Sequence, residues 1–179
     1  YSLLGQEHAE KHFLDADYII VGPGVPREKY KDAQEKEPEK FLNDAVIFFN
    51  SVKNPIIAVT GTRGKTTTAN WIAHFLRARP ASAQGFSGAR WPNVQVAGNT
   101  PENPLLKAID SLGDFEAPVV VELSSWQLEF LDQALRAPDV AVITNLYPDH
   151  LNRYSSMEEY ALAKVNIFKN QTEKQFLIL

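Results

Sequence analysis

The stretch "AVTGTRGKTTTANWIAHFLR", residues 58–77, places a glycine-punctuated turn between an apolar run and a helix-like run. A turn of this kind at the start of a helix directs free backbone N–H groups and the positive end of the helix dipole at an anion. Gly61 and Gly64 allow a close backbone approach that a side chain would block. Lys65 would reach the β- and γ-phosphates of a nucleotide, and Thr66 would offer a hydroxyl to Mg²⁺. The stretch predicts a phosphate-binding loop; the alternative is a helix start with a threonine-rich first turn.

The spacing of the glycines separates this loop from the general P-loop. That pattern, G-x-x-x-x-G-K-[ST], requires glycine at position 59, where this chain has Val59. The spacing here is G-x-x-G-K-T. The departure disfavours a generic GTPase or kinase and leaves other classes of nucleotide-binding protein.

Strand-like and helix-like segments alternate around the loop. Strands are predicted at 55–61, 93–99, 117–125, 138–145 and the last residues of the chain, and helices at 64–78, 102–112, up to about 135, and 156–170. This alternation predicts an α/β fold, a doubly wound parallel sheet of the P-loop type with helices on both faces. Ligands of such sheets bind beyond the carboxyl ends of the strands. We therefore expect one crevice formed by the polar clusters that follow the strand ends, at 60–67, 98–103, 122–125 and 145–154.

The residues before the Asn54-Pro55 pair read as a separate unit. Its segments are a β-rich run ending in a Gly-Pro-Gly turn, a charged helix broken near a proline, and a helix with one broad apolar face, at 17–26, 27–40 and 41–52. We predict a division after residue 54, with 1–54 as part of a Rossmann-like domain and 55–179 as the nucleotide-binding domain. Residues 79–92 are predicted to be a loop.

Composition excludes several classes of function. The 179 residues carry a formal net charge of −4 and include no cysteine. Broad electrostatic capture of nucleic acid is therefore disfavoured, and disulfides, thiolate metal sites and cysteine nucleophiles are excluded. No apolar run approaches the length of a membrane span, and no leader reads as a signal peptide, which predicts a soluble cytoplasmic protein. Because the chain opens without Met and closes on the apolar run "QFLIL", we expect an excerpt of a longer protein.

The loop resembles the ATP loop of the Mur ligase family, which reads G-T-x-G-K-[ST]. Other stretches resemble the D-glutamate-adding branch of that family in the same order: "ADYIIVGPGVP" (16–26), "VELSSWQLE" (121–129), "TNLYPDHLNRY" (144–154) and "YALAKVNIF" (160–168). Several motifs in register are far more specific than one. The resemblance implies that the chain holds the end of a UDP-substrate-binding domain (1–54) and an incomplete central ATP-binding domain (55–179), without the carboxy-terminal domain.

The resemblance also implies roles for individual residues. ATP would be bound by Gly61, Thr62, Arg63, Gly64, Lys65, Thr66 and Thr67. One Mg²⁺ would be held by Thr66 and Glu122, and a second by His150, with Asp149 orienting it, and by Lys164. The lysine matching Lys164 is carbamylated by CO₂ in the family, which turns an ammonium into an oxygen donor.

Each of these side chains also has an alternative role that involves no ligand. Glu122 can be a capping or exposed carboxylate, His150 a structural or exposed histidine, and Lys164 a surface lysine with a buried stem.

The activity implied by the resemblance is ATP-dependent amide formation. A substrate carboxylate attacks the γ-phosphate to give an acyl phosphate, and the amine of an amino acid then displaces phosphate, with Lys65, His150 and Lys164 as the catalytic residues. The acceptor would be UDP-N-acetylmuramoyl-L-alanine, contacted by Gly24, Asn99 and Ser124, and the amine D-glutamate, in peptidoglycan precursor synthesis. We expect a monomer with no nucleic-acid or membrane partner.

Three positions depart from the family pattern. Gly22 stands where serine is usual, Arg63 where asparagine is usual, and "TPENP" follows Asn99 in place of the family's glycine-containing segment. The G-T-R-G-K-[ST] loop is shared with the related poly-γ-glutamate synthases. Two alternatives therefore stay open: another amide ligase of the superfamily, and a nucleotide-binding module that forms no bond.

Overall fold

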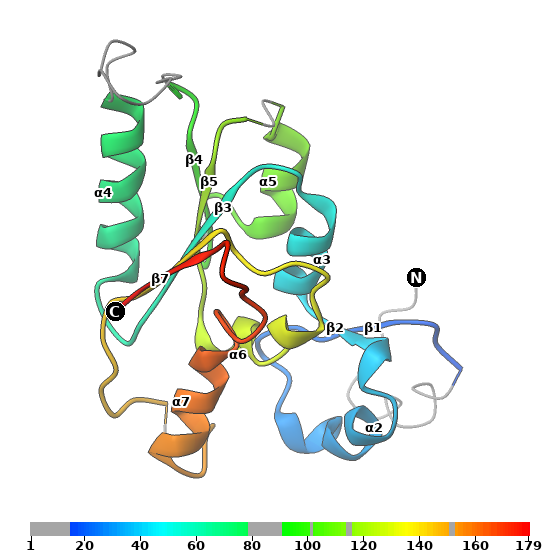
Figure 1. Ribbon diagram of the computed structural model, residues 1–179. Helices are drawn as coiled ribbons and strands as arrows, with labels where there is room; N and C mark the ends of the chain where they lie inside the picture. The colour runs from blue at the N-terminus through cyan, green and yellow to red at the C-terminus, as the bar shows by residue number, and fades with distance from the viewer. Residues whose placement is uncertain (1–14, 79–90, 101, 114–115, 151–152) are drawn as a thin grey trace.

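The centre of the molecule is a five-stranded parallel sheet with strand order β4-β5-β3-β6-β7 (Figure 1). The computed structural model describes residues 15–78, 91–100, 102–113, 116–150 and 153–179. In sheet order the strands are Gln95–Gly98, Val119–Glu122, Ile56–Thr60, Val140–Ile143 and Phe176–Ile178. The predicted α/β class with a parallel sheet is confirmed. The predicted loop at 79–92 lies outside the described residues except for its last two.

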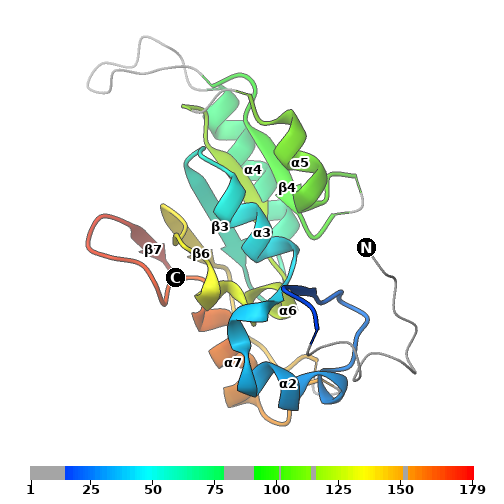
Figure 2. The same cartoon turned by 90° about the vertical axis from the view of Figure 1, so that its right-hand side faces the viewer.

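Helices cover both faces of the sheet. In Figures 1 and 2, α4 (Lys65–Ala78) lies on one face, and α3 (Asp44–Ser51) and α5 (Leu105–Ser111) lie on the other. Side chains of β3 alternate accordingly: Val59 packs with α4, whereas Ile56 and Ala58 pack with α3. Strands buried on both faces explain the continuous apolar runs that mark them in the sequence.

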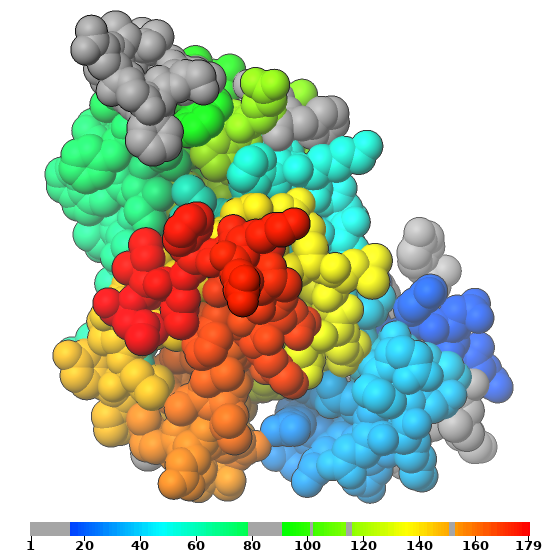
Figure 3. Space-filling view, in the orientation of Figure 1, coloured from blue at the N-terminus to red at the C-terminus, as the bar shows by residue number. Residues whose placement is uncertain are grey.

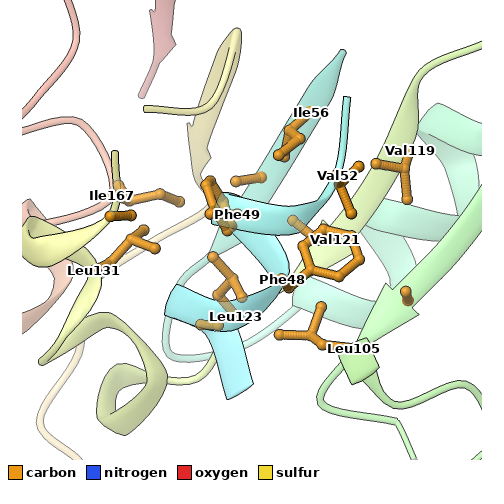
Figure 4. Close-up of a cluster of buried hydrophobic side chains, with 14 of the residues drawn as sticks. Phe48, Phe49, Val52, Ile56, Leu105, Val119, Val121, Leu123, Leu131 and Ile167 are labelled. Atoms are coloured by element: carbon orange, nitrogen blue, oxygen red, sulfur yellow. The ribbon is translucent and has the colours of Figure 1, made fainter. Parts of the chain in front are cut away.

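The larger core lies between the sheet and α3. Phe48 and Phe49 are fully buried there, against Val121 and other strand residues (Figure 4). Burial of an aromatic side chain of this size contributes about 2–3 kcal/mol. Helix α3 therefore packs on the sheet although it precedes the division predicted after residue 54, and that division stays a prediction.

The residues before α3 form a small unit around two short parallel strands, β1 (Ile19–Ile20) and β2 (Phe41–Leu42). The prediction of one helix over 41–52 is wrong at its start, because residues 41 and 42 pair with β1. Helix α3 begins only after Asn43, whose side-chain oxygen accepts a hydrogen bond from the N–H of Val46 at 3.1 Å.

The predicted charged helix over 27–40 is also broken more than expected. It consists of the 3-10 turn η1 (Arg27–Lys29), the helix α2 (Lys31–Lys36) and the 3-10 turn η2 (Pro38–Lys40). Proline at the start of η2 cannot supply the N–H that a continuing α-helix needs.

Short helices follow β5 and β6. They are α6 (Ser125–Leu128), the 3-10 turn η3 (Leu131–Gln133) and α7 (Met157–Val165). The helix predicted over 156–170 thus ends earlier, because the N–H groups of Ile167 and Phe168 bond three residues back and tighten the chain into turns. None of the helices described is long and apolar enough to cross a membrane.

Candidate functional site

The turn between β3 and α4 is a glycine-dependent loop. Gly61 has a φ of 151° and Gly64 a φ of 80°, both in the region that favours glycine. A Cβ on Gly61 would collide with the hydroxyl of Thr144 and would lie 3.2 Å from the backbone nitrogen of Asn145. Nothing lies within 4 Å of a Cβ built on Gly64. Glycine is thus required at 61 by packing and conformation, and at 64 by conformation alone.

The segment after β6 braces this loop. The N–H groups of Thr62 and Arg63 donate to the backbone and side-chain oxygens of Asn145, at 3.1 and 3.0 Å. The hydroxyl of Thr144 donates to the carbonyl of Arg63 at 2.7 Å. The sequence predicts that this segment lies in the crevice but not that it supports the loop; the one local signal is a polar pair directly after a buried strand.

The substitution Gly61→Ala should therefore lower both the stability of the fold and the affinity for ATP. The added methyl group must displace residues 144–145 and hold a strained φ, which should cost about 1–3 kcal/mol of unfolding free energy. Gly113→Ala is the matched control, since a Cβ there meets nothing within 4 Å. Thermal unfolding and ATP titration of both variants measure the effects. Equal stability and ATP affinity in the two variants would show that the loop does not need its close contact with Thr144.

The loop lysine and the metal-binding candidates stand side by side. Nζ of Lys65 donates to the carbonyls of Gly61 and Thr62, at 3.1 and 3.2 Å. The hydroxyl of Thr66 donates to Oε2 of Glu122 at 2.7 Å, and Glu122, at the end of β5, is 3% exposed. Of the two alternatives for Glu122, a capping or an exposed carboxylate, the exposed one is thus wrong.

This pair of oxygens fits Mg²⁺. That ion takes one or two protein oxygen ligands together with waters and substrate phosphates. Among the described residues no group of three or more His, Cys, Asp or Glu side chains can hold a metal. A Mg²⁺ ion at this place could take the hydroxyl of Thr66 and the carboxylate of Glu122, and its remaining ligands would have to come from phosphates and water.

Lys164 is buried directly behind the loop. It is 3% exposed, and its Nζ donates to the carbonyl of Gly61 at 3.1 Å and to the hydroxyl of Thr60 at 3.4 Å. Burial, together with a smaller contribution from the nearby charge of Lys65, lowers the pKa of this amine to about 8, and Asp149 opposes the shift. The alternative of a surface lysine is therefore wrong, and a sizeable share of the amine is neutral near pH 8.

His150 lies at the rim of the site. It is exposed and adopts a φ of 54°, unusual for a residue other than glycine, and its N–H donates to Oδ1 of Asp149 at 2.8 Å. Its ring packs edge-on against Tyr160, with centroids 5.9 Å apart. Nζ of Lys164 lies over the ring of Tyr160, 4.7 Å from its centroid. The hydroxyl of Tyr160 forms a hydrogen bond of 3.3 Å with the hydroxyl of Thr62. Tyr160 thus contacts the loop, His150 and Lys164, a role that the sequence alone does not indicate.

A cavity of about 460 Å³ at the carboxyl edge of the sheet collects many of the predicted residues. The predicted residues that line it are Gly24, Gly61, Lys65, Asn99, Ser124, His150 and Lys164. Its lining also includes Arg27, Arg153 and Tyr160, to which the sequence alone assigns no individual role in the site. Thr62, Arg63, Gly64, Thr66, Thr67 and Glu122 are not part of this lining. The structure thus brings one part of the predicted set to a shared cavity, and connects Glu122 to the loop through Thr66. The roles of these residues stay predictions.

The two acceptor-contact candidates after β4 and β5 differ in how free they are. Ser124 caps α6, and its hydroxyl and its N–H both donate to the side chain of Gln127 at 3.0 Å. Asn99 bonds through its backbone N–H to the carbonyl of Glu122 at 3.0 Å, and its side chain is exposed. Asn99 is therefore the freer of the two to bind a substrate.

Residues 59–179 match the family model described as the Mur ligase middle domain. The chain is 39% identical over 173 residues to the UDP-N-acetylmuramoylalanine--D-glutamate ligase of Geobacter sp. (strain M21), covering 96% of this chain and 35% of that protein. It is 38% identical over 174 residues to the ligase of the same name from Clostridioides difficile (strain 630), again covering 96% and 35%. The chain thus spans about a third of the length of the curated relatives it matches.

Solved structures agree on the fold. The MurF ligase of Thermotoga maritima in complex with ADP superposes with a TM-score of 0.53 at 21% identity, covering 96% of this chain and 38% of that one. MurF from Acinetobacter baumannii gives a TM-score of 0.52 at 18% identity, covering 75% and 28%. With the loop, the sheet order and the match over residues 59–179 in agreement, the chain belongs to the Mur ligase family.

Proposed function

We propose that the polypeptide to which these residues belong is an ATP-dependent ligase that joins D-glutamate to UDP-N-acetylmuramoyl-L-alanine, a step of peptidoglycan precursor synthesis. The observation that supports this most directly is the shared cavity. It is lined by Lys65 of the phosphate loop, by Asn99 directly after β4, and by Gly24 of the amino-terminal unit. A cavity between a phosphate loop and a second unit suits a reaction between ATP and another bound substrate. Relatives carrying the corresponding name at 36–39% identity favour this acceptor and this amino acid.

Each residue of the site has a task in this reaction. The backbone N–H groups of the loop and the Lys65 ammonium would hold the phosphates of ATP, and their charge would stabilise the γ-phosphoryl group during transfer. Mg²⁺ held by Thr66 and Glu122 would neutralise phosphate charge. The acceptor carboxylate would attack the γ-phosphate from the side of Asn99, and the amine of D-glutamate would then displace phosphate from the acyl phosphate.

Lys164 would become the second anionic group of the site once its amine is carbamylated. Its buried amine, with a pKa lowered to about 8 chiefly by burial, is suited to react with CO₂ in the neutral form. The nitrogen attacks the carbon of CO₂ and loses a proton, which gives a carbamate. We propose that this carbamate and His150 support a second Mg²⁺, as the family resemblance implies.

The chain would supply two parts of the whole enzyme. We propose that residues 1–54 end the UDP-substrate-binding domain and that 55–179 form part of the central ATP-binding domain. The amino-acid site would lie in sequence outside these residues. We further propose that the whole protein is a cytoplasmic monomer.

Phosphate release by the whole protein tests the function. With ATP, Mg²⁺ and UDP-N-acetylmuramoyl-L-alanine, phosphate should appear only when D-glutamate is added, and the product should gain the mass of one glutamyl residue. L-Glutamate in place of D-glutamate is the matched control. Release with L-glutamate without the acceptor would instead identify a γ-glutamyl polymer synthase, and no release with any amine would identify a nucleotide-binding module.

A further inference from the structure

Arg27 brings a cation from the amino-terminal unit to the rim of the cavity. It is the first residue of η1, directly after the turn at 22–26, and it lines the same cavity as Lys65 and Lys164. Its Nη1 donates to Oε1 of Glu159 on α7 at 2.7 Å. Figure 3 shows the segment that starts at Arg27 beside α7 at the lower end of this face. The guanidinium thus connects two units that flank the cavity.

The carboxylate of Glu159 is itself fixed in position by hydrogen bonds. Its Oε2 accepts hydrogen bonds from the N–H and the hydroxyl of Ser155, both at 2.8 Å, which leaves Oε1 for Arg27. The backbone N–H of Glu159 donates to the hydroxyl of Ser156, so the residue is fixed in the first turn of α7. These bonds from Ser155, with a smaller contribution from Arg27, lower the pKa of Glu159. The carboxylate is therefore ionised and oriented near neutral pH.

The rest of the Arg27 guanidinium faces no hydrogen-bond acceptor among the described residues. Among the residues that the structure describes, Nε and Nη2 of Arg27 donate no hydrogen bond, and its side chain is 38% exposed. The adjacent turn is also open, since a Cβ built on Gly24 meets nothing within 4 Å. An oxyanion can therefore approach both the guanidinium and the backbone of the turn. Planar N–H pairs of arginine match the oxygens of phosphate.

We infer that Arg27 binds the diphosphate of the acceptor and that Glu159 is the positioning residue that aims it. This inference rests on the proposed function. The acceptor carries two kinds of anion, and its carboxylate must reach the γ-phosphate beside Lys65. The anion left for the amino-terminal turn is then the diphosphate. Arg27 would set the affinity for nucleotide-linked acceptors and take no part in the phosphoryl transfer.

Substitution of Arg27 should change the acceptor affinity alone. In the whole protein Arg27→Gln should raise the KM for UDP-N-acetylmuramoyl-L-alanine by about tenfold to a hundredfold, the range for a lost hydrogen bond to a charged group. The KM for ATP and kcat at saturating acceptor should stay within about twofold of wild type, because the phosphate loop is untouched. Lys31→Gln, which removes a charge of the same unit in an exposed pair with Glu35, is the matched control. An unchanged acceptor KM in Arg27→Gln would overturn the inference.

An acceptor without the nucleotide separates diphosphate binding from other causes. N-acetylmuramoyl-L-alanine should react poorly and with the same kcat/KM in the wild type and in Arg27→Gln. A loss of the same factor with both acceptors would show that Arg27 does not contact the diphosphate. Glu159→Gln should raise the acceptor KM less than Arg27→Gln, and the double variant should resemble Arg27→Gln, since both changes act through one contact. Additive effects would show that Glu159 does not position Arg27.

Binding of inorganic pyrophosphate distinguishes failure of this inference from failure of the ligase assignment. Calorimetry on the same protein, without ATP, should show weaker pyrophosphate binding in Arg27→Gln than in the wild type or in Lys31→Gln. This difference in a protein with no ligase activity would retain Arg27 as an oxyanion site and reject the proposed reaction. Equal pyrophosphate binding together with an unchanged acceptor KM in an active ligase would reject the role of Arg27 and retain the reaction.

Discussion

Lys65→Ala should reduce ATP binding to the limit of detection. In the structure Nζ of Lys65 is turned onto the loop, bonded to the carbonyls of Gly61 and Thr62. It thus lies where the terminal phosphates of a nucleotide would meet the N–H groups at the start of α4. A unit-charge contact at 4 Å is worth about 4 kcal/mol at an effective dielectric constant of 20, so ATP affinity should fall by at least about a hundredfold. Titration with ATP and Mg²⁺, by calorimetry, measures the change.

Two comparisons make this result specific. Lys107→Ala removes an exposed lysine of α5, on the face of the sheet away from α4, and should leave ATP affinity unchanged. The thermal midpoint of Lys65→Ala should stay close to that of wild type, because the carbonyls of Gly61 and Thr62 can bond to water instead. ATP binding of wild-type strength in Lys65→Ala would remove the phosphate-loop assignment, and with it the proposed reaction.

The sheet and the loop could be predicted from sequence because both depend on local patterns. Residues 56–60 form a buried apolar run and 65–78 a helix, with the glycines between them at positions that need positive φ. Such signals lie within a few residues of each other. Convergence of Lys65, Asn99 and His150 on one cavity was also predictable, because the carboxyl ends of parallel strands meet at one edge.

Contacts between distant segments account for what the sequence did not reveal. Phe41 has apolar helical periodicity with the residues after it, yet it pairs with Ile19 in a parallel strand. Arg27 and Glu159 are separated by 132 positions, and nothing in either local sequence indicates their ion pair. Tyr160 reads as one apolar residue of α7, while its contacts with Thr62 and His150 arise only when the sheet is assembled. Long-range pairing overrides local propensity at each of these positions.

Lys164→Ala should retain ATP binding and lose turnover. Lys164 lies behind the loop, bonded to the carbonyl of Gly61 and to the hydroxyl of Thr60, so the loop backbone can still bind phosphates without it. The loss should appear in kcat, by about a hundredfold to a thousandfold, as for removal of one group that stabilises transferring charge. Lys169→Ala, an exposed lysine just beyond α7 that pairs with Asp132, is the control and should leave kcat unchanged. A small carboxylic acid such as acetate should restore part of the activity, because it can supply the oxygen donor that a carbamate would provide.

The pH dependence of Lys164 then tests the modification itself. Only the neutral amine attacks CO₂, and its share rises with pH through the pKa of about 8, whereas an exposed lysine stays almost wholly protonated until above pH 9. At fixed dissolved ¹³CO₂ the wild type should therefore show a carbamate carbon signal that grows from pH 7 to pH 9 and is missing in Lys164→Ala. Full activity of Lys164→Ala, or a signal that survives the substitution, would show that the buried amine is a structural group. Among the described residues the buried ammonium donates to the Gly61 carbonyl and the Thr60 hydroxyl and lies over one aromatic ring, which is a costly arrangement for a charge; the proposed conversion to an anion beside Mg²⁺ would give that burial a chemical reason.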